Sequence, residues 1–166
     1  KHMMLFPRTY STRGDHVEAY RQLMGLKEGR RPSFFQDKGY MFSHQIWHMY
    51  FRYFGWNFIG RASDIQDAGI MTPLSAFEKV PSQIANNKAR NNYYMLPLIL
   101  GLMGLIFHFS RNKKDASVVA LLFFFTGLAI VLYLNQPPIE PRERDYAFAG
   151  SFYAFSIWVG FGVLFL

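Results

Sequence analysis

The densest group of reactive side chains in this sequence lies at residues 135–145, which read Asn-Gln-Pro-Pro-Ile-Glu-Pro-Arg-Glu-Arg-Asp. Four charged residues follow one another at its end, from Arg142 to Asp145. The three prolines fix φ and keep the stretch out of a helix, so the charged side chains stand on a stiff loop. We call residues 135–145 the charged loop.

The side chains of the charged loop suit the binding of a phosphate. Arg142 and Arg144 could hold a phosphate or pyrophosphate, because a guanidinium matches two of its oxygens at once. The carboxylate of Glu143 could act as a base, and Gln136 and Asp145 join the candidate substrate-binding residues. Alternatively, the alternating charges pair with one another in a solvated ion-pair network. The residues alone leave both interpretations open.

A second group of polar residues lies in the segment 40–58, which is unusually rich in aromatic side chains. The spacing of these polar residues predicts one stripe of a helix that faces a cavity or lies in a membrane interface. Whether the segment crosses a membrane stays open. Arg52, and Arg61 just beyond the segment, could bind an anionic head group or extend toward water. The stripe consists of His44, Gln45, His48 and Arg52.

His44 and His48 lie one helical turn apart, which is a spacing that metal ligands use. No carboxylate stands near them in the sequence, so we interpret them as members of the polar stripe and predict no metal. The sequence has no phosphate-binding glycine loop and no dinucleotide fingerprint, and we expect no cofactor.

Three long apolar runs must position these residues. They cover residues 93–110, 116–134 and 146–166, each about as long as a bilayer core of roughly 30 Å requires. The sequence therefore predicts an all-α, polytopic integral membrane protein with two parts. Residues 1–92 form an outer-face helical and aromatic segment, and residues 93–166 form three transmembrane helices. The glycines of these runs suit close helix packing: Gly101, Gly104, Gly127, Gly160 and Gly162.

The short loop 111–115 predicts the orientation, because cytoplasmic loops carry an excess of Lys and Arg. Residues 1–92 and the charged loop are then both on the outer face. The net charge of +7 suits membrane lipids or a lipid-linked phosphate, and without a Lys/Arg run or a glycine-rich binding loop we expect no nucleic acid. The abrupt ends of the chain suggest an internal piece of a longer membrane protein.

Three blocks of sequence resemble a known family: residues 50–61, 91–101 and 133–146, the last with Gly150 to Tyr153 beyond it. Together they are similar to large membrane proteins of Bacteroidetes that carry the DUF2723 domain. Those proteins resemble GT-C glycosyltransferases that are related to protein O-mannosyltransferases.

The resemblance implies an inner-membrane enzyme that transfers a sugar from a polyprenyl-phosphate donor to an acceptor, expected to be a protein, on the periplasmic face. It implies that Arg142 and Arg144 neutralise the leaving phosphate and that Glu143 assists the acceptor hydroxyl. The main catalytic acid is expected outside this chain, which would be inactive alone. The alternative is a scaffold or accessory subunit of a membrane complex that docks through residues 40–58.

Overall fold

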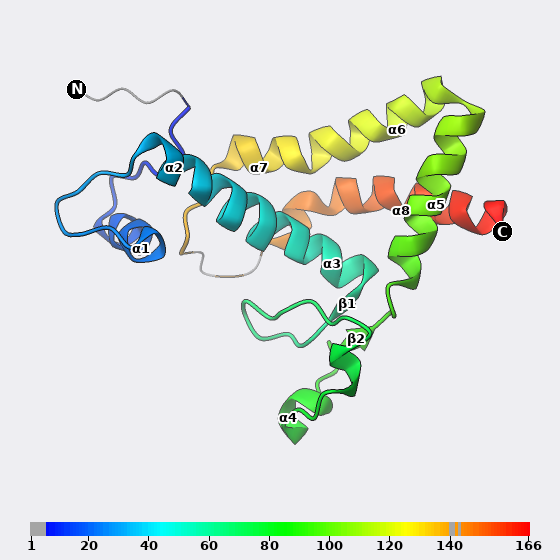
Figure 1. Ribbon diagram of the computed structural model, residues 1–166, viewed down its shortest axis with the longest axis horizontal. Helices are drawn as coiled ribbons and strands as arrows, with labels where there is room; N and C mark the ends of the chain where they lie inside the picture. Colours follow the sequence, from blue (N-terminus) through cyan, green and yellow to red (C-terminus); the bar gives the residue numbers. More distant parts are fainter. Residues whose placement is uncertain (1–5, 140–141, 143) are drawn as a thin grey trace.

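The computed structural model describes residues 6–139, 142 and 144–166, and these are mostly helical (Figure 1). Helices make up 64% and strands 3%, which confirms the predicted helical class. The first helix, α1 (Gly14–Met24), ends where Gly25 adopts a left-handed conformation with φ of 61°. Helix α2 (Phe34–Tyr40) begins at a capping box, in which Ser33 and Gln36 each bond the backbone N–H of the other.

The predicted aromatic segment 40–58 forms the C-terminal part of one continuous helix over residues 34–58, which we call the aromatic helix. This helix comprises α2, a π-helical stretch η1 (Met41–Phe51) and α3 (Arg52–Phe58). Its buried aromatic rings pack between the later helices, each ring stabilising the fold by about 1.5–3 kcal/mol. The rings belong to two hydrophobic clusters. The buried members of the first are Met49, Tyr50, Tyr53, Trp56, Val131 and Phe148, and those of the second are Phe54, Phe58, Phe155 and Trp158.

Residues 62–90 follow, and we call them the connector. A short antiparallel pair of strands holds its two ends together. β1 (Gly60–Arg61) pairs with β2 (Asn91–Asn92), with Gly60 opposite Asn92. Between the strands lie only short helical turns, η2 (Ser75–Phe77) and α4 (Ser82–Ala85). The strand pair therefore brings both ends of the connector next to the end of α3.

The apolar half of the chain contains two long helices, at the second and third predicted spans, and a shorter apolar helix at the first. α6 (Lys113–Thr126) and α7 (Leu128–Leu134) form one continuous helix, and η3 (Asp145–Phe148) continues into α8 (Ala149–Phe165). Both are long and apolar enough to cross a bilayer. The predicted span at residues 93–110 is different: α5 (Leu96–Arg111) has 16 residues, about 24 Å at the α-helical rise.

Two features define α5. Tyr94 and Met95 have positive φ angles of 52° and 61°, which stop the helix from extending back over them. In addition, α5 packs closely against α8: Gly104 faces Trp158, and further along both helices the ring of Phe107 lies 5.6 Å from that of Phe165. In place of the predicted loop 111–115, only Asn112 separates α5 from α6. Its side chain caps α6 by accepting from the N–H groups of Lys114 and Asp115.

Glycines set the closeness of the α5–α8 crossing. A Cβ on Gly104 would stand 1.8 Å from the carbonyl oxygen of Trp158, and one on Gly162 would stand 2.0 Å from that of Leu100. Gly101 likewise admits the ring of Phe155. The predicted packing role thus holds here and at Gly127, whereas Gly160 has open space around it.

Candidate functional site

The two predicted groups of polar residues meet in one small pocket. The π-helical stretch η1 and the start of α3 contribute one wall, the connector a second and the charged loop a third. We call it the basic pocket. Its cavity of ≈ 30 Å³ has room for about one water molecule, not for a sugar. The lining residues are His44, His48, Met49, Arg52, Tyr53, Gln66, Asp67, Pro138 and Arg142.

Arg52 is the buried cation of the basic pocket. Its Nε donates to the carbonyl oxygen of His48 at 2.8 Å, and its Nη2 lies 3.6 Å from the Oδ1 of Asp67. The guanidinium also lies 4.8 Å from the ring centroid of Trp56. These contacts fix the orientation of Arg52, so an incoming anion would meet a preorganised cation that already has a carboxylate beside it.

The two histidines form a ladder of rings along one face of the helix. Tyr40 stacks on His44 and His44 on His48, each at 5.2 Å between ring centroids. His48 closes the ladder with its Nε2 2.9 Å from the Oδ1 of Asp67. Burial and the neighbouring His48 lower the pKa of His44 to about 4, so His44 is neutral near pH 7.

Arg142 lies at the exposed mouth of the basic pocket. Its guanidinium stands 5.8 Å from the ring centroid of Tyr146, a weak cation–π contact at an exposed site. The geometry therefore separates two roles. Arg52 fixes positive charge in the interior, and Arg142 can reach a ligand that is too large to enter.

The remaining predicted site residues lie elsewhere. Arg61 sits 4.0 Å over the ring of Trp56 and donates to the carbonyl oxygen of Ser63 at 2.8 Å, outside the pocket lining. The backbone N–H of Arg144 donates to the hydroxyl of Tyr53 at 3.4 Å, and Asp145 starts η3. Glu143 falls outside the described residues. Of the predicted set, the structure unites Arg52 and Arg142 in one pocket.

Gln136 is buried in the interior, where it serves the fold. Its backbone oxygen accepts from the hydroxyl of Tyr40 and from the Nε2 of Gln45, both at 2.8 Å. The side-chain Nε2 of Gln136 is buried and has no hydrogen-bond partner among the described residues. Gln136 therefore anchors the start of the charged loop to the aromatic helix.

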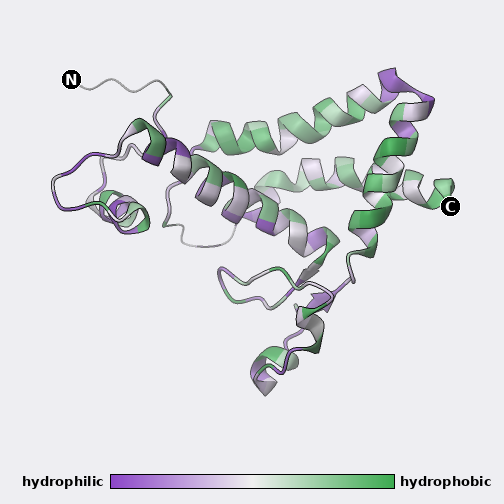
Figure 2. Cartoon of the chain, viewed as in Figure 1, coloured by the Kyte–Doolittle hydropathy of each residue, from purple (hydrophilic) through white to green (hydrophobic). Residues whose placement is uncertain are grey.

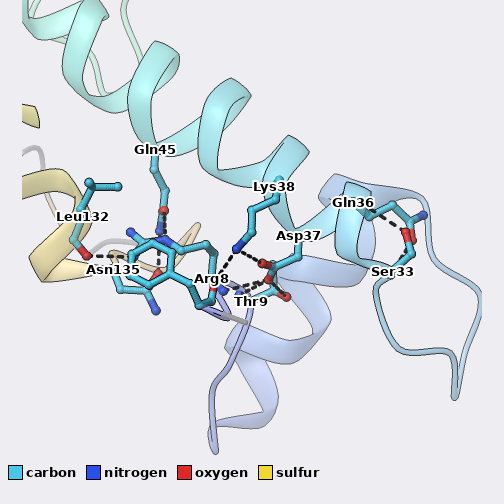
Figure 3. Close-up of polar contacts among 10 residues, drawn as sticks. Arg8, Thr9, Ser33, Gln36, Asp37, Lys38, Gln45, Leu132 and Asn135 are labelled. Atoms are coloured by element: carbon cyan, nitrogen blue, oxygen red, sulfur yellow. Dashed lines mark hydrogen bonds and ion pairs between the residues drawn. The ribbon is translucent and has the colours of Figure 1, made fainter. Parts of the chain in front are cut away.

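A buried polar network that no sequence pattern predicted connects the N-terminal segment to the end of α7 (Figure 3). Arg8 is 2% exposed; its Nε donates to Gln45 at 2.9 Å and its Nη1 to the carbonyl oxygen of Leu132 at 2.8 Å. Asp37 is fully buried, and its Oδ1 accepts from the backbone N–H groups of Arg8 and Thr9.

Asp37 stays charged in this network. Its burial alone would raise its pKa, but hydrogen bonds from the hydroxyl of Thr9, from two backbone N–H groups and from Lys38 lower it overall. A local signal for this region existed, since Ser33 and Gln36 predict a helix start just before Asp37. The pairing with Arg8 had no such signal.

Comparison with known protein families matches residues 1–42 to a family described as "Family of unknown function (DUF8416)". The match covers about a quarter of the chain, 42 of 166 residues. No curated protein and no solved structure matches the chain.

The resemblance to DUF2723 membrane proteins is wrong. Neither that family nor any glycosyltransferase family matches the chain, and the three blocks that suggested it lie outside residues 1–42. These blocks are rich in aromatic side chains, Asn, Gly and Pro. Such residues gather at the ends of apolar helices in unrelated proteins, because Trp and Tyr favour bilayer interfaces and Gly and Pro favour turns.

Proposed function

We propose that this chain is part of a multi-pass membrane protein that binds the phosphate of a lipid-linked substrate at the mouth of the basic pocket. The observation that carries the proposal is the convergence of Arg52 and Arg142, which come from distant parts of the sequence, in one pocket. Two guanidinium groups in a pocket whose His44 is neutral favour an anionic ligand.

The exposed surface of the long helices supports a membrane setting. Hydrophobic residues predominate along α6 and α7, and hydrophilic residues gather at the turn between α5 and α6 (Figure 2). A soluble protein rarely exposes a contiguous apolar surface of this extent. The large exposed apolar residues of this helix are Val118, Leu121, Leu122, Phe124, Phe125, Tyr133 and Leu134.

The ligand is expected to sit outside the cavity, against Arg142. Among the residues that the structure describes, no carboxylate forms an ion pair with Arg142. Its guanidinium can therefore meet a phosphate without first giving up an ion pair in the described part of the chain. Arg52 adds positive charge from behind and keeps its own bonds.

Transfer of a sugar from a polyprenyl-phosphate donor on the periplasmic face is the enzymatic form of this proposal. Arg142 and Arg144 would stabilise the charge that develops on the leaving phosphate. With the family resemblance removed, the support for this step is the chemistry of the arginines alone.

The test is binding of a polyprenyl phosphate, with the uncharged polyprenol as reference, to the full chain in phosphatidylcholine nanodiscs. We expect Arg142→Ala to weaken binding of the phosphate about tenfold, the usual value of one charge-assisted hydrogen bond. Arg111→Ala, which removes the same charge near the turn between α5 and α6, is the matched control and should leave binding unchanged. Equal affinity for the phosphate and the polyprenol would exclude the proposal.

Exposed aromatic side chains on the aromatic helix favour the accessory-subunit alternative. Trp47 and Phe51 are exposed on the aromatic helix and contact each other at 5.8 Å between ring centroids. Together with exposed Phe42 they form an apolar face that a partner subunit or lipid could cover. Trp47→Ala would then release a co-purifying subunit, while binding of the polyprenyl phosphate would stay the same.

A further inference from the structure

A second and much larger cavity lies at the opposite end of the aromatic helix, beside α1. It has a volume of ≈ 680 Å³, within the range of cavities that hold small-molecule ligands. Its walls come from the segment 7–11, from α1 and from the loop that joins α1 to α2. That loop swings wide of α1 (Figure 1), and we call the half-open space between them the N-terminal cavity.

The lining of the N-terminal cavity combines an apolar body with a cationic side. Most of the lining surface is apolar, from residues on both the helix and the loop. Three arginines join it: Arg21 from α1, and Arg30 and Arg31 from the loop. No Asp or Glu is among the described residues that line it. The apolar and aromatic lining residues are Pro7, Tyr10, Val17, Tyr20, Met24, Leu26 and Pro32.

Two of the three cations are uncommitted within the described part of the chain. Arg21 pairs with Glu18 at 3.5 Å on the surface of α1. Arg30 and Arg31 are exposed, and neither forms an ion pair with a described residue. Positive charge at the edge of an apolar cavity without a balancing carboxylate favours an anionic ligand.

The walls of the cavity are fixed by the rest of the fold. The buried ring of Tyr20 packs edge-on against Tyr40 at 5.1 Å. The opposite wall is held through Thr9, whose hydroxyl donates to the buried Asp37 at 2.7 Å. At the loop, Gly25 and Gly29 adopt the left-handed conformation that the wide turn requires. The cavity is thus present before any ligand binds, which lowers the entropic cost of binding.

We propose that the N-terminal cavity binds a single-chain amphiphilic anion. The phosphate head group lies between Arg30 and Arg31, and the alkyl chain lies against Val17, Met24 and Leu26. This site shares no lining residue with the basic pocket and does not depend on the function proposed for it. It lies wholly within residues 1–42, the segment that matches the family model.

The test uses dodecyl phosphate with a diazirine near the end of its chain, added to the full chain in phosphatidylcholine nanodiscs. After irradiation, mass spectrometry locates the labelled peptides. We expect labelling within residues 17–26, competed by unlabelled dodecyl phosphate but not by dodecanol or inorganic phosphate alone. The paired variant Arg30→Ala/Arg31→Ala should raise the probe concentration that half-saturates this labelling at least about tenfold.

The matched control is Arg13→Ala/Lys27→Ala, which removes two positive charges from the same region but outside the lining. It should leave the labelling unchanged, as should Arg142→Ala in the basic pocket. Val17→Phe should block the label by filling the cavity while retaining the helical circular dichroism spectrum. Labelling confined to α5–α8, or equal losses in the two paired variants, would overturn the proposal.

Discussion

The guanidinium of Arg8 binds the end of α7 by donating from Nη1 to the carbonyl oxygen of Leu132, across 124 residues of sequence. Nη2 donates to the neighbouring carbonyl of Val131 at 3.1 Å. The carbonyl of Val131 also accepts from the backbone N–H of Asn135 at 3.3 Å, whereas that of Leu132 belongs to the last-turn carbonyls that a helix cannot satisfy by itself. A cation there also complements the helix dipole. The N-terminal segment and the apolar helix are therefore one folding unit.

Loss of this cation is expected to destabilise the protein strongly. Arg8→Ala leaves the side-chain oxygen of Gln45 and the carbonyl oxygen of Leu132 without this donor, at a cost of about 1–3 kcal/mol for each group. Arg8→Lys should retain part of the stability, because it restores the charge but not the forked geometry. Unfolding in denaturant monitored by tryptophan fluorescence measures the effect. The exposed Arg13→Ala is the control, and an equal loss there would contradict the capping role.

Two glycines of the helical bundle should respond oppositely to the same substitution. Gly104→Ala places a Cβ 1.8 Å from the carbonyl oxygen of Trp158, so α5 and α8 must separate, costing about 1–3 kcal/mol or more. Gly160→Ala on α8 meets nothing within 4 Å and should gain up to about 1 kcal/mol of helix propensity. The thermal unfolding midpoints of both variants measure these two effects. Similar midpoints would mean that the close crossing does not form.

The stability of the protein should decrease in mild acid because of His44. Its pKa is about 4 in the folded chain, below its ordinary value near 6.5, mainly because burial disfavours the charged imidazole. The unfolded chain therefore binds more protons between these values. The stabilising contribution is complete above pH 6.5 and is lost as the pH falls toward 4.

His44→Gln should flatten this dependence of the unfolding midpoint on pH between 4 and 6.5. A proton NMR titration of the His44 imidazole gives an independent reading of its pKa. An unchanged slope in the variant, or titration of His44 near its ordinary pKa, would contradict the burial that the structure gives this ring.

Local patterns in the sequence predicted the helices well, and long-range contacts account for what they missed. The helical stripe through His44 and Arg52 and the uncharged runs depend on neighbours within one or two turns. The short α5 depends on the positive φ angles of Tyr94 and Met95, which side-chain type does not signal for Tyr or Met.

The candidate site was predictable as parts but not as an assembly. Arg52 and Arg142 each stood out as possible phosphate ligands from their own surroundings. Their meeting in one pocket depends on how the charged loop returns to the aromatic helix, which Gln45 fixes through the backbone of Gln136. No sequence pattern predicted the role of Arg8, because its partners include main-chain carbonyls, which every residue carries.

Chemical labelling should distinguish the two ends of the helix Lys113–Leu134. If Lys113–Leu134 crosses the bilayer, its two ends face opposite sides. The sequence contains no cysteine, so single cysteines at Ser110 and Ile139, both exposed, report on each end without background. Ser43→Cys should behave like Ile139→Cys, because neighbouring Gln45 bonds Gln136 at the start of the charged loop.

A membrane-impermeant maleimide added to intact cells should therefore label positions 43 and 139 and spare position 110 until the membrane is opened. This pattern follows from the Lys and Arg residues of the turn at 111–114, which favour the cytoplasmic side. Labelling of position 110 alone would reverse the orientation and place the basic pocket in the cytoplasm, where an outer-face donor could not reach it. Labelling of all three positions from outside would mean that Lys113–Leu134 does not span the membrane.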